Sequence, residues 1–280
     1  MTLKTNLKKR PTDGTKASFL LIIGLVIGLP SLLILFSCHN KPKQVFTYKL
    51  QLNMTEKVLD STRSLLFNFK SNDFKEKAGF KLNSKVIVDR QNNTIELFLT
   101  TKANTPPSSA PLETATELDS LQIGTYQLMI HFKDQNLPGA LTLNDHSYML
   151  KLKQNAYVSI KTDTLNKLPR KAIFGTLHYY SPDAEPLIDA FIASLKELGA
   201  KDQSYYPGNY HFFVINADGQ IKQTRDKGYA YTRHFIFHYD GDKAALKALV
   251  KRFAFAHSTQ LLITLNTYDG ATYNIWSFGD

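Results

Sequence analysis

Apolar and polar residues alternate along residues 45–165, and a period of two is typical of β-strands. Within this stretch, residues 86–99 are expected to form a hairpin that turns at 91–93, where asparagine tolerates a positive φ. Several short strands separated by turn residues predict a β-sandwich-like domain over 45–165. One face of its first strand carries four apolar or aromatic residues: Phe46, Tyr48, Leu50 and Leu52.

Two stretches of this half leave helical interpretations open. Residues 55–69 also fit a helix capped by Thr55, with apolar residues at helical spacing, so an α+β arrangement remains an alternative here. Residues 104–111 contain three prolines and predict a loop. Residues 113–120 would then add a short helix before the chain returns to strand.

The pattern changes after a polar stretch at residues 163–171, which predicts a domain boundary. Beyond it, strand-like and helix-like periods follow each other in the order of a ferredoxin-like βαββαβ domain over 170–280, with an extra edge strand. The fold class expected for the whole chain is therefore α+β. The segments behind this prediction are strands at 172–180, 210–215, 231–239, 260–267 and 272–278, and helices after Pro182 and after Asp240 or Asp242.

The N-terminus has the pattern of a membrane-targeting helix. A polar, basic leader at 1–16 precedes an uncharged apolar run at 17–37, and the sole cysteine, Cys38, follows at once. Such a run directs insertion into a membrane. Residues 39–44 are polar and form a short spacer before the first strand.

The residues Leu35-Phe36-Ser37-Cys38 resemble the lipobox of bacterial lipoproteins. The resemblance implies that residues 1–38 form a lipoprotein signal peptide with its cleavage site, that Cys38 is lipidated, and that membrane lipid is a partner through this residue. Because His39 follows Cys38 instead of aspartate, the resemblance favours the outer membrane over the inner membrane. The alternative is an uncleaved signal anchor, which places the rest of the chain on the same side.

A second resemblance lies in the first half. The stretch 121–132 contains Gly-Thr-Tyr followed by alternating apolar residues and resembles a strand entry of immunoglobulin-like sandwiches. The resemblance implies a fold and carries no information on function.

Charge and composition exclude several classes. The net charge is +10, of which the first 37 residues contribute +4, so +6 remains on the exported part without a run of basic residues. No nucleic-acid partner is therefore expected. No signature of a serine hydrolase, zinc protease or nucleotide-binding loop is present, so the sequence nominates no catalytic residue, metal or cofactor.

Two histidines form one candidate site. If the first and third strands of the predicted ferredoxin-like domain are parallel neighbours, His178 and His238 lie at equivalent ends of the sheet, close to Asp240. Such a cluster would suit a metal or acid–base site. Surface histidines on a strand face are the simpler interpretation.

Aromatic residues form a second candidate site. Tyr205 and Tyr206 lie in a loop rich in tyrosine, glycine and asparagine, and Trp276 lies in the last predicted strand. Aromatic faces of this kind suit carbohydrate stacking, although ordinary turn chemistry explains the same loop composition.

These observations favour a membrane-tethered, non-enzymatic lipoprotein of the bacterial cell envelope that acts as an adaptor or accessory subunit and binds another envelope protein. One alternative is a lipoprotein that binds a carbohydrate or peptidoglycan fragment through Tyr205, Tyr206 and Trp276. The other is a metal-dependent hydrolase centred on the two histidines.

Overall fold

The computed structural model describes residues 49–59, 62–71, 78–108 and 112–278. Residues 48–280 form one compact unit. The predicted signal segment at 1–38 with Cys38, and the predicted spacer at 39–44, lie outside the described residues. The division of residues 39–280 into domains at 45–165 and 170–280 stays a prediction.

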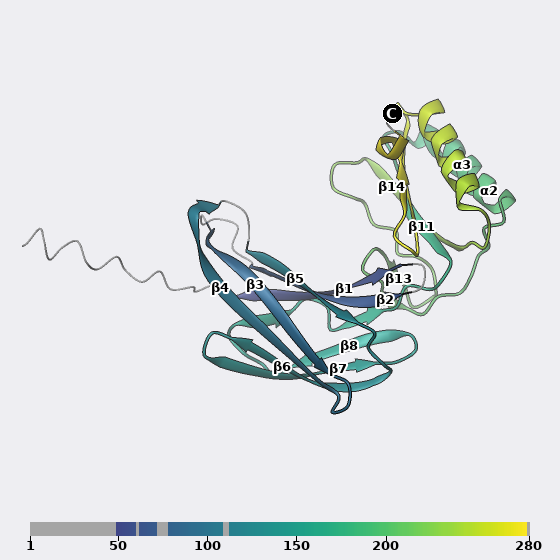
Figure 1. Cartoon of the computed structure of the whole chain (residues 1–280). Helices are drawn as coiled ribbons and strands as arrows, with labels where there is room; N and C mark the ends of the chain where they lie inside the picture. The colour runs from purple at the N-terminus through teal and green to yellow at the C-terminus, as the bar shows by residue number, and fades with distance from the viewer. Residues whose placement is uncertain (1–48, 60–61, 72–77, 109–111, 279–280) are drawn as a thin grey trace, which may run out of the picture. The chain divides into compact units, whose positions relative to one another are not determined.

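Two antiparallel-rich sheets form a β-sandwich (Figure 1). The four-stranded sheet has the order β5-β2-β1-β9, and the six-stranded sheet has the order β10-β8-β7-β6-β4-β3. The first sheet contains β1 (Leu50–Val58), β2 (Arg63–Ser71), β5 (Glu113–Asp119) and β9 (Val158–Ile160). The second contains β3 (Ala78–Asp89), β4 (Thr94–Ser108), β6 (Gly124–Phe132), β7 (Gln135–Leu143), β8 (Ser147–Leu152) and β10 (Thr164–Asn166).

Alternation of apolar residues explains why these segments pair as strands. In β2, Phe67 and Phe69 are buried while Asn68 between them is half-buried. In β4, Ile95, Leu97 and Leu99 are buried on one face, as the sequence pattern predicts. Burying each such side chain contributes about 1.5–3 kcal/mol, so a one-residue slip of register would cost several of these contributions at once.

A third sheet follows, with the order β14-β11-β15-β16. One face of this sheet packs against two helices through a shared apolar core (Figure 1). The alternate residues of β11, Ile173, Leu177 and Tyr179, belong to this core. The elements are β11 (Ala172–Tyr179), η1 (Pro182–Ala184), α2 (Glu185–Glu197), β14 (Tyr231–His238), α3 (Lys243–Ala256), β15 (Leu261–Thr267), β16 (Thr272–Asn274) and η2 (Ile275–Phe278).

The opposite face of the third sheet is covered by the segment that follows α2. Phe174 of β11 packs in a second apolar core with Tyr205, Tyr210 and Phe213. Two very short strands, β12 (Gly208–Asn209) and β13 (Val214–Ile215), pair with each other in this segment. The tyrosine-rich loop is thereby attached to the sheet.

The predicted α+β class with a ferredoxin-like domain is wrong, because the described chain is mostly a β-sandwich and contains two α-helices. A ferredoxin-like sheet requires the segment at 210–215 as a full strand and its first and third strands as parallel neighbours. Here that segment forms a separate two-stranded ribbon. In addition, β11 pairs antiparallel with both β14 and β15.

The helical alternative for 55–69 and the short helix predicted at 113–120 are also wrong. The stretch 55–69 contains parts of β1 and β2, which pair in a hairpin with Glu56 opposite Leu65. The stretch 113–120 falls largely in β5, which pairs with β2. The predicted loop at 104–111 begins inside β4, which extends to Ser108. In each segment, pairing with a neighbouring strand outweighs the local helical or turn preference.

Candidate functional site

A cavity of about 420 Å³ lies where a turn of the sandwich meets the tyrosine-rich loop. Its volume falls within the range of small-molecule sites, about 300–1,000 Å³. Its walls combine three basic side chains with an imidazole and three tyrosines: Arg63, Lys167, Arg170, His146, Tyr205, Tyr206 and Tyr210.

The turn between β7 and β8 positions His146. The Asn144 side-chain oxygen accepts hydrogen bonds from the backbone N–H groups of His146, at 2.8 Å, and Ser147, at 2.6 Å. Asparagine closes turns in this way because its side chain imitates a backbone acceptor. The His146 ring is therefore held at the cavity by a fixed turn.

Strand β10 brings the cationic segment to the same place. Its last residue, Asn166, pairs with Ser147 at the start of β8. The following residue, Lys167, donates its backbone N–H to the His146 carbonyl at 2.7 Å. Antiparallel pairing therefore places residues 167–170 beside a turn about 20 residues earlier in the chain.

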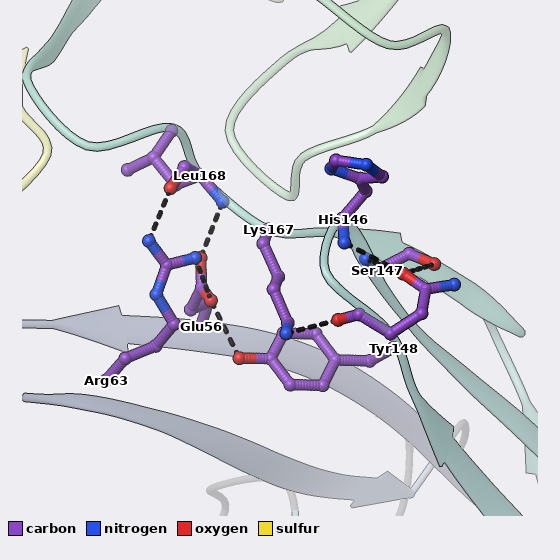
Figure 2. Close-up of polar contacts among 8 residues, drawn as sticks. Glu56, Arg63, His146, Ser147, Tyr148, Lys167 and Leu168 are labelled. Atoms are coloured by element: carbon purple, nitrogen blue, oxygen red, sulfur yellow. Dashed lines mark hydrogen bonds and ion pairs between the residues drawn. The ribbon is translucent and has the colours of Figure 1, made fainter. Parts of the chain in front are cut away.

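A buried carboxylate holds this segment from below (Figure 2). Glu56 accepts hydrogen bonds from the Arg63 guanidinium at 2.8 Å, the Tyr148 hydroxyl at 2.8 Å and the Leu168 backbone N–H at 2.7 Å. Arg63 also donates to the Leu168 carbonyl at 2.7 Å. Both backbone polar groups of Leu168 are thus bound by one ion pair.

The Glu56 carboxylate is buried in a position that the strand pattern assigns to apolar residues. Its side chain is 4% exposed, and that of Arg63 is 22% exposed. Burial raises the pKa of the Glu56 carboxyl, while the Arg63 charge and the three hydrogen bonds oppose that rise. Burial also raises the pKa of the Tyr148 hydroxyl. The tyrosine therefore remains a neutral donor to Glu56 at physiological pH.

The tyrosine-rich loop is pinned to β10 by one side chain. The Asn166 amide donates to the carbonyls of Tyr206, at 3.3 Å, and Pro207, at 3.0 Å. A Cβ added to Gly208 would lie 2.7 Å from that amide, and Gly208 has a φ of +135°. Glycine is therefore required for the loop to approach Asn166 this closely.

Tyr206 presents an aromatic surface at the cavity. Its ring lies 4.1 Å from the His146 ring, centroid to centroid, with an interplanar angle of 33°. The side chain is nevertheless 57% exposed. Tyr206 therefore has a supported position and a large accessible surface, which is the combination that ring stacking on a ligand requires.

Tyr205 lines the same cavity from a buried position. Within the described part of the chain, its hydroxyl has no hydrogen-bond partner. A buried hydroxyl without a partner costs free energy, and such groups are often satisfied by a bound molecule or water. Burial raises the pKa of this hydroxyl, so it is neutral at physiological pH.

The two predicted histidines are not brought together. In the antiparallel pair β11–β14, His178 lies opposite Thr232 and His238 lies opposite Ala172. Six residues along a strand correspond to roughly 20 Å, too far for one shared ion. His178 instead stacks on Tyr229 at 3.8 Å, and His238 pairs with Asp240 at 2.6 Å.

Other observations bear on the remaining predicted sites. Trp276 is 71% exposed in η2 and does not line the cavity that contains Tyr205 and Tyr206. Among the described residues, no group of three or more histidine, cysteine, aspartate or glutamate side chains is arranged to hold a metal ion. Every helix in that part of the chain is too short or too polar to cross a bilayer.

Comparisons with known proteins assign no family to this fold and cavity. No family model matches the chain, and no curated protein or solved structure matches it either. The functional argument therefore rests on the side chains themselves.

The sequence predictions included two of the cavity residues, Tyr205 and Tyr206, but missed its charged half. One signal was present: the alternation in β1 places Glu56 on the same face as Leu52 and Met54. A carboxylate in an apolar row needs a cationic or hydrogen-bonding partner. Nothing in the local pattern identified Lys167 as its neighbour, because that contact depends on strand pairing.

Proposed function

We propose that this chain is a membrane-tethered, non-enzymatic binding protein of the bacterial cell envelope, and that it holds a carbohydrate fragment in the cavity beside Tyr206. The tether is inferred from the lipobox-like residues ending at Cys38. The binding role is inferred from the cavity.

The observation that carries the proposal is the pairing of Tyr206 with His146. An exposed tyrosine supported by a second ring and pinned through Asn166 offers a rigid stacking surface, so little side-chain entropy is lost when a sugar ring binds. The neighbouring Tyr205 and the basic side chains supply polar groups at the same cavity. Few groups of this kind are needed to orient a ligand.

Retention on an immobilised peptidoglycan-derived glycan tests this proposal. We expect Tyr206→Ala to weaken retention about tenfold, because one good ring-stacking contact is worth about 1.4 kcal/mol. Trp276→Ala is the matched control, since Trp276 is also an exposed aromatic residue but lies outside the cavity lining. Equal retention of the parent chain and both variants, or equal loss in both, would contradict the proposal.

An adaptor role is a second candidate, favoured by exposed aromatic residues away from the cavity. Trp276 is largely exposed, Phe255 of α3 is 54% exposed, and the Phe255 ring contacts that of Phe278 at 6.4 Å. Exposed apolar surface of this kind marks many protein interfaces. A photo-crosslinking side chain at position 276 should then trap one discrete envelope partner, whereas the same probe at Asp218 should not. Recovery of the chain as an uncrosslinked monomer with the probe at either position would count against the adaptor role.

A further inference from the structure

The charges around the cavity are not balanced. Among the described residues that line it, three carry a positive charge, Arg63, Lys167 and Arg170, and Asp145 is the only carboxylate. The next question is which of these cations is already neutralised by the protein.

Arg63 is neutralised by its own partner. Its guanidinium forms an ion pair with Glu56 at 2.8 Å and donates to the Leu168 carbonyl at 2.7 Å. Its charge is therefore used to hold the segment that forms the cavity wall. Counting Glu56 and Asp145 against the three cations leaves one positive charge at the site.

Like Arg170, Lys167 has no carboxylate within ion-pair distance in the described structure, and its ammonium is held in place by neighbouring groups. Its ammonium donates to the Asn144 carbonyl and lies 5.2 Å from the centre of the Tyr148 ring (Figure 2). Both partners are neutral. An ammonium has three donors, and the Asn144 carbonyl takes one of them. Donors therefore remain for an acceptor in the cavity.

The surroundings of Lys167 oppose its charge. Partial burial and the nearby Arg63 lower the pKa of the Lys167 ammonium, and Glu56 and Asp145 offset only part of this effect. An anion bound in the cavity would compensate the charge and would form charge-assisted hydrogen bonds, which are stronger than neutral ones.

We infer that the ligand of this cavity is an acidic sugar fragment, whose carboxylate binds the Lys167 ammonium while a sugar ring lies against Tyr206. This inference rests on the proposed carbohydrate-binding function and narrows its ligand class. A single carboxylate matches the one uncompensated positive charge better than a phosphate monoester, which carries close to two negative charges at neutral pH.

A matched pair of disaccharides tests the inference. The acidic probe is GlcNAc–MurNAc, which carries a lactyl carboxylate, and the neutral probe is GlcNAc–GlcNAc. Lactate alone is the third probe and supplies the acid without the sugar. Calorimetric titration of the full chain in detergent measures the three affinities. We expect the acidic disaccharide to bind about tenfold more tightly than the neutral one, with an advantage that decreases as salt increases.

Substitutions locate the acid-binding group. Lys167→Gln should lower the affinity for the acidic disaccharide to that for the neutral one. Lys167→Arg should retain much of the preference for the acidic disaccharide. Lys151→Gln, in the neighbouring strand β8 and outside the cavity lining, should change neither affinity. Thermal unfolding of each variant shows whether the substitution has altered folding instead of binding.

The outcomes separate the two claims. Equal binding of both disaccharides, with loss of both in Tyr206→Ala, would overturn the acidic ligand and leave the carbohydrate function in place. If lactate binds as tightly as the acidic disaccharide, the sugar contributes nothing to binding, and the proposed carbohydrate-binding function is contradicted. Absence of binding by all three probes would overturn both claims. An acid preference that survives Lys167→Gln would contradict the role given to Lys167.

Discussion

Glu56 occupies a position in β1 that its neighbours assign to the sandwich core. Leu52 and Met54 precede it on the same face and are buried. A lone carboxylate there would be unfavourable by several kcal/mol, so its partners decide whether the strand is stable. The Arg63 guanidinium supplies the opposite charge, and the Leu168 N–H connects the pair to the cavity wall.

Removing Arg63 tests this arrangement. Arg63→Met leaves Glu56 buried without its counter-charge and the Leu168 carbonyl without that donor. We expect the free energy of unfolding to fall by about 3 kcal/mol near pH 7, as measured by chemical denaturation. Lys70→Met is the control, because the Lys70–Glu113 ion pair is long, at 3.6 Å, and exposed. This control substitution should lower the free energy of unfolding by less than about 1 kcal/mol.

The same variant has a defined pH dependence. Burial already raises the pKa of Glu56 above its ordinary value of 4.5, so the folded chain binds this proton more tightly than the unfolded chain. The associated stability is fully present below pH 4.5 and is lost as the pH rises through the folded-state pKa. Arg63→Met raises the pKa of Glu56 further. The loss in free energy of unfolding that this variant shows relative to the parent chain should therefore become smaller toward pH 4. A loss in free energy of unfolding that stays constant between pH 4 and pH 8 would contradict the ion-pair explanation.

Among the secondary-structure elements, α3 shows what local sequence predicts well. Its apolar residues Leu246, Leu249 and Val250 recur at helical spacing and are buried, and the cap lies where an aspartate was expected. The Asp242 carboxylate accepts from the Ala244 N–H at 2.8 Å, which satisfies one of the free donors of the first turn. Asp240 instead pairs with Lys171 and His238.

Loss of this cap should destabilise the helix by a predictable amount. We expect Asp242→Ala to lower the free energy of unfolding by about 1 kcal/mol, because one N-terminal donor of α3 loses its acceptor. Asp242→Asn retains a side-chain oxygen at the same place and should cost only a few tenths of that. Equal losses in the two variants would show that the charge, and not the cap hydrogen bond, is what matters.

The elements that were mispredicted share a physical reason. The segment at 113–120 is too short for local preference to decide, and it becomes β5 because β2 offers it a free edge. The stretch 55–69 satisfies a helical stripe and a strand alternation at once, and the hairpin β1–β2 buries Leu65, Phe67 and Phe69. Both segments form strands because they pair with another strand of the chain, and a prediction from local sequence alone does not include that pairing.

For the whole molecule, strand alternation predicted the β-rich first half but not the topology of the second. The sequence pattern after residue 171 fits a ferredoxin-like sheet, but the observed order β14-β11-β15-β16 leaves the segment at 210–215 out of the sheet. In addition, β11 and β14 are antiparallel, and the alternation of apolar residues does not encode strand direction. The shared histidine site failed for this reason, since it required His178 and His238 on parallel strands.

The cavity was half predictable on the same grounds. Composition identified the tyrosine-rich loop, because Tyr205 and Tyr206 lie next to each other in the sequence. The cationic wall joins residues from β2, the β7–β8 turn and the segment after β10. Those residues are distant in the sequence and meet only through sheet pairing.

The tether at Cys38 is a prediction from the sequence and lies outside the described residues. Cys38→Ser should abolish metabolic lipid labelling and leave a longer precursor, because the thiol that receives the lipid is absent. A parent chain that carries no label and retains residues 1–37 would favour the signal anchor. Both interpretations predict that residues 39–280 lie on the same side of the membrane.

The most direct test of the central claim is a crystal structure of the chain with the GlcNAc–MurNAc disaccharide at saturating concentration. We expect a sugar ring against the Tyr206 ring and the lactyl carboxylate at hydrogen-bond distance, about 2.7–3.2 Å, from the Lys167 ammonium. A disaccharide bound at another surface, such as that around Trp276, would contradict the account. So would a cavity that stays empty while the disaccharide is in excess.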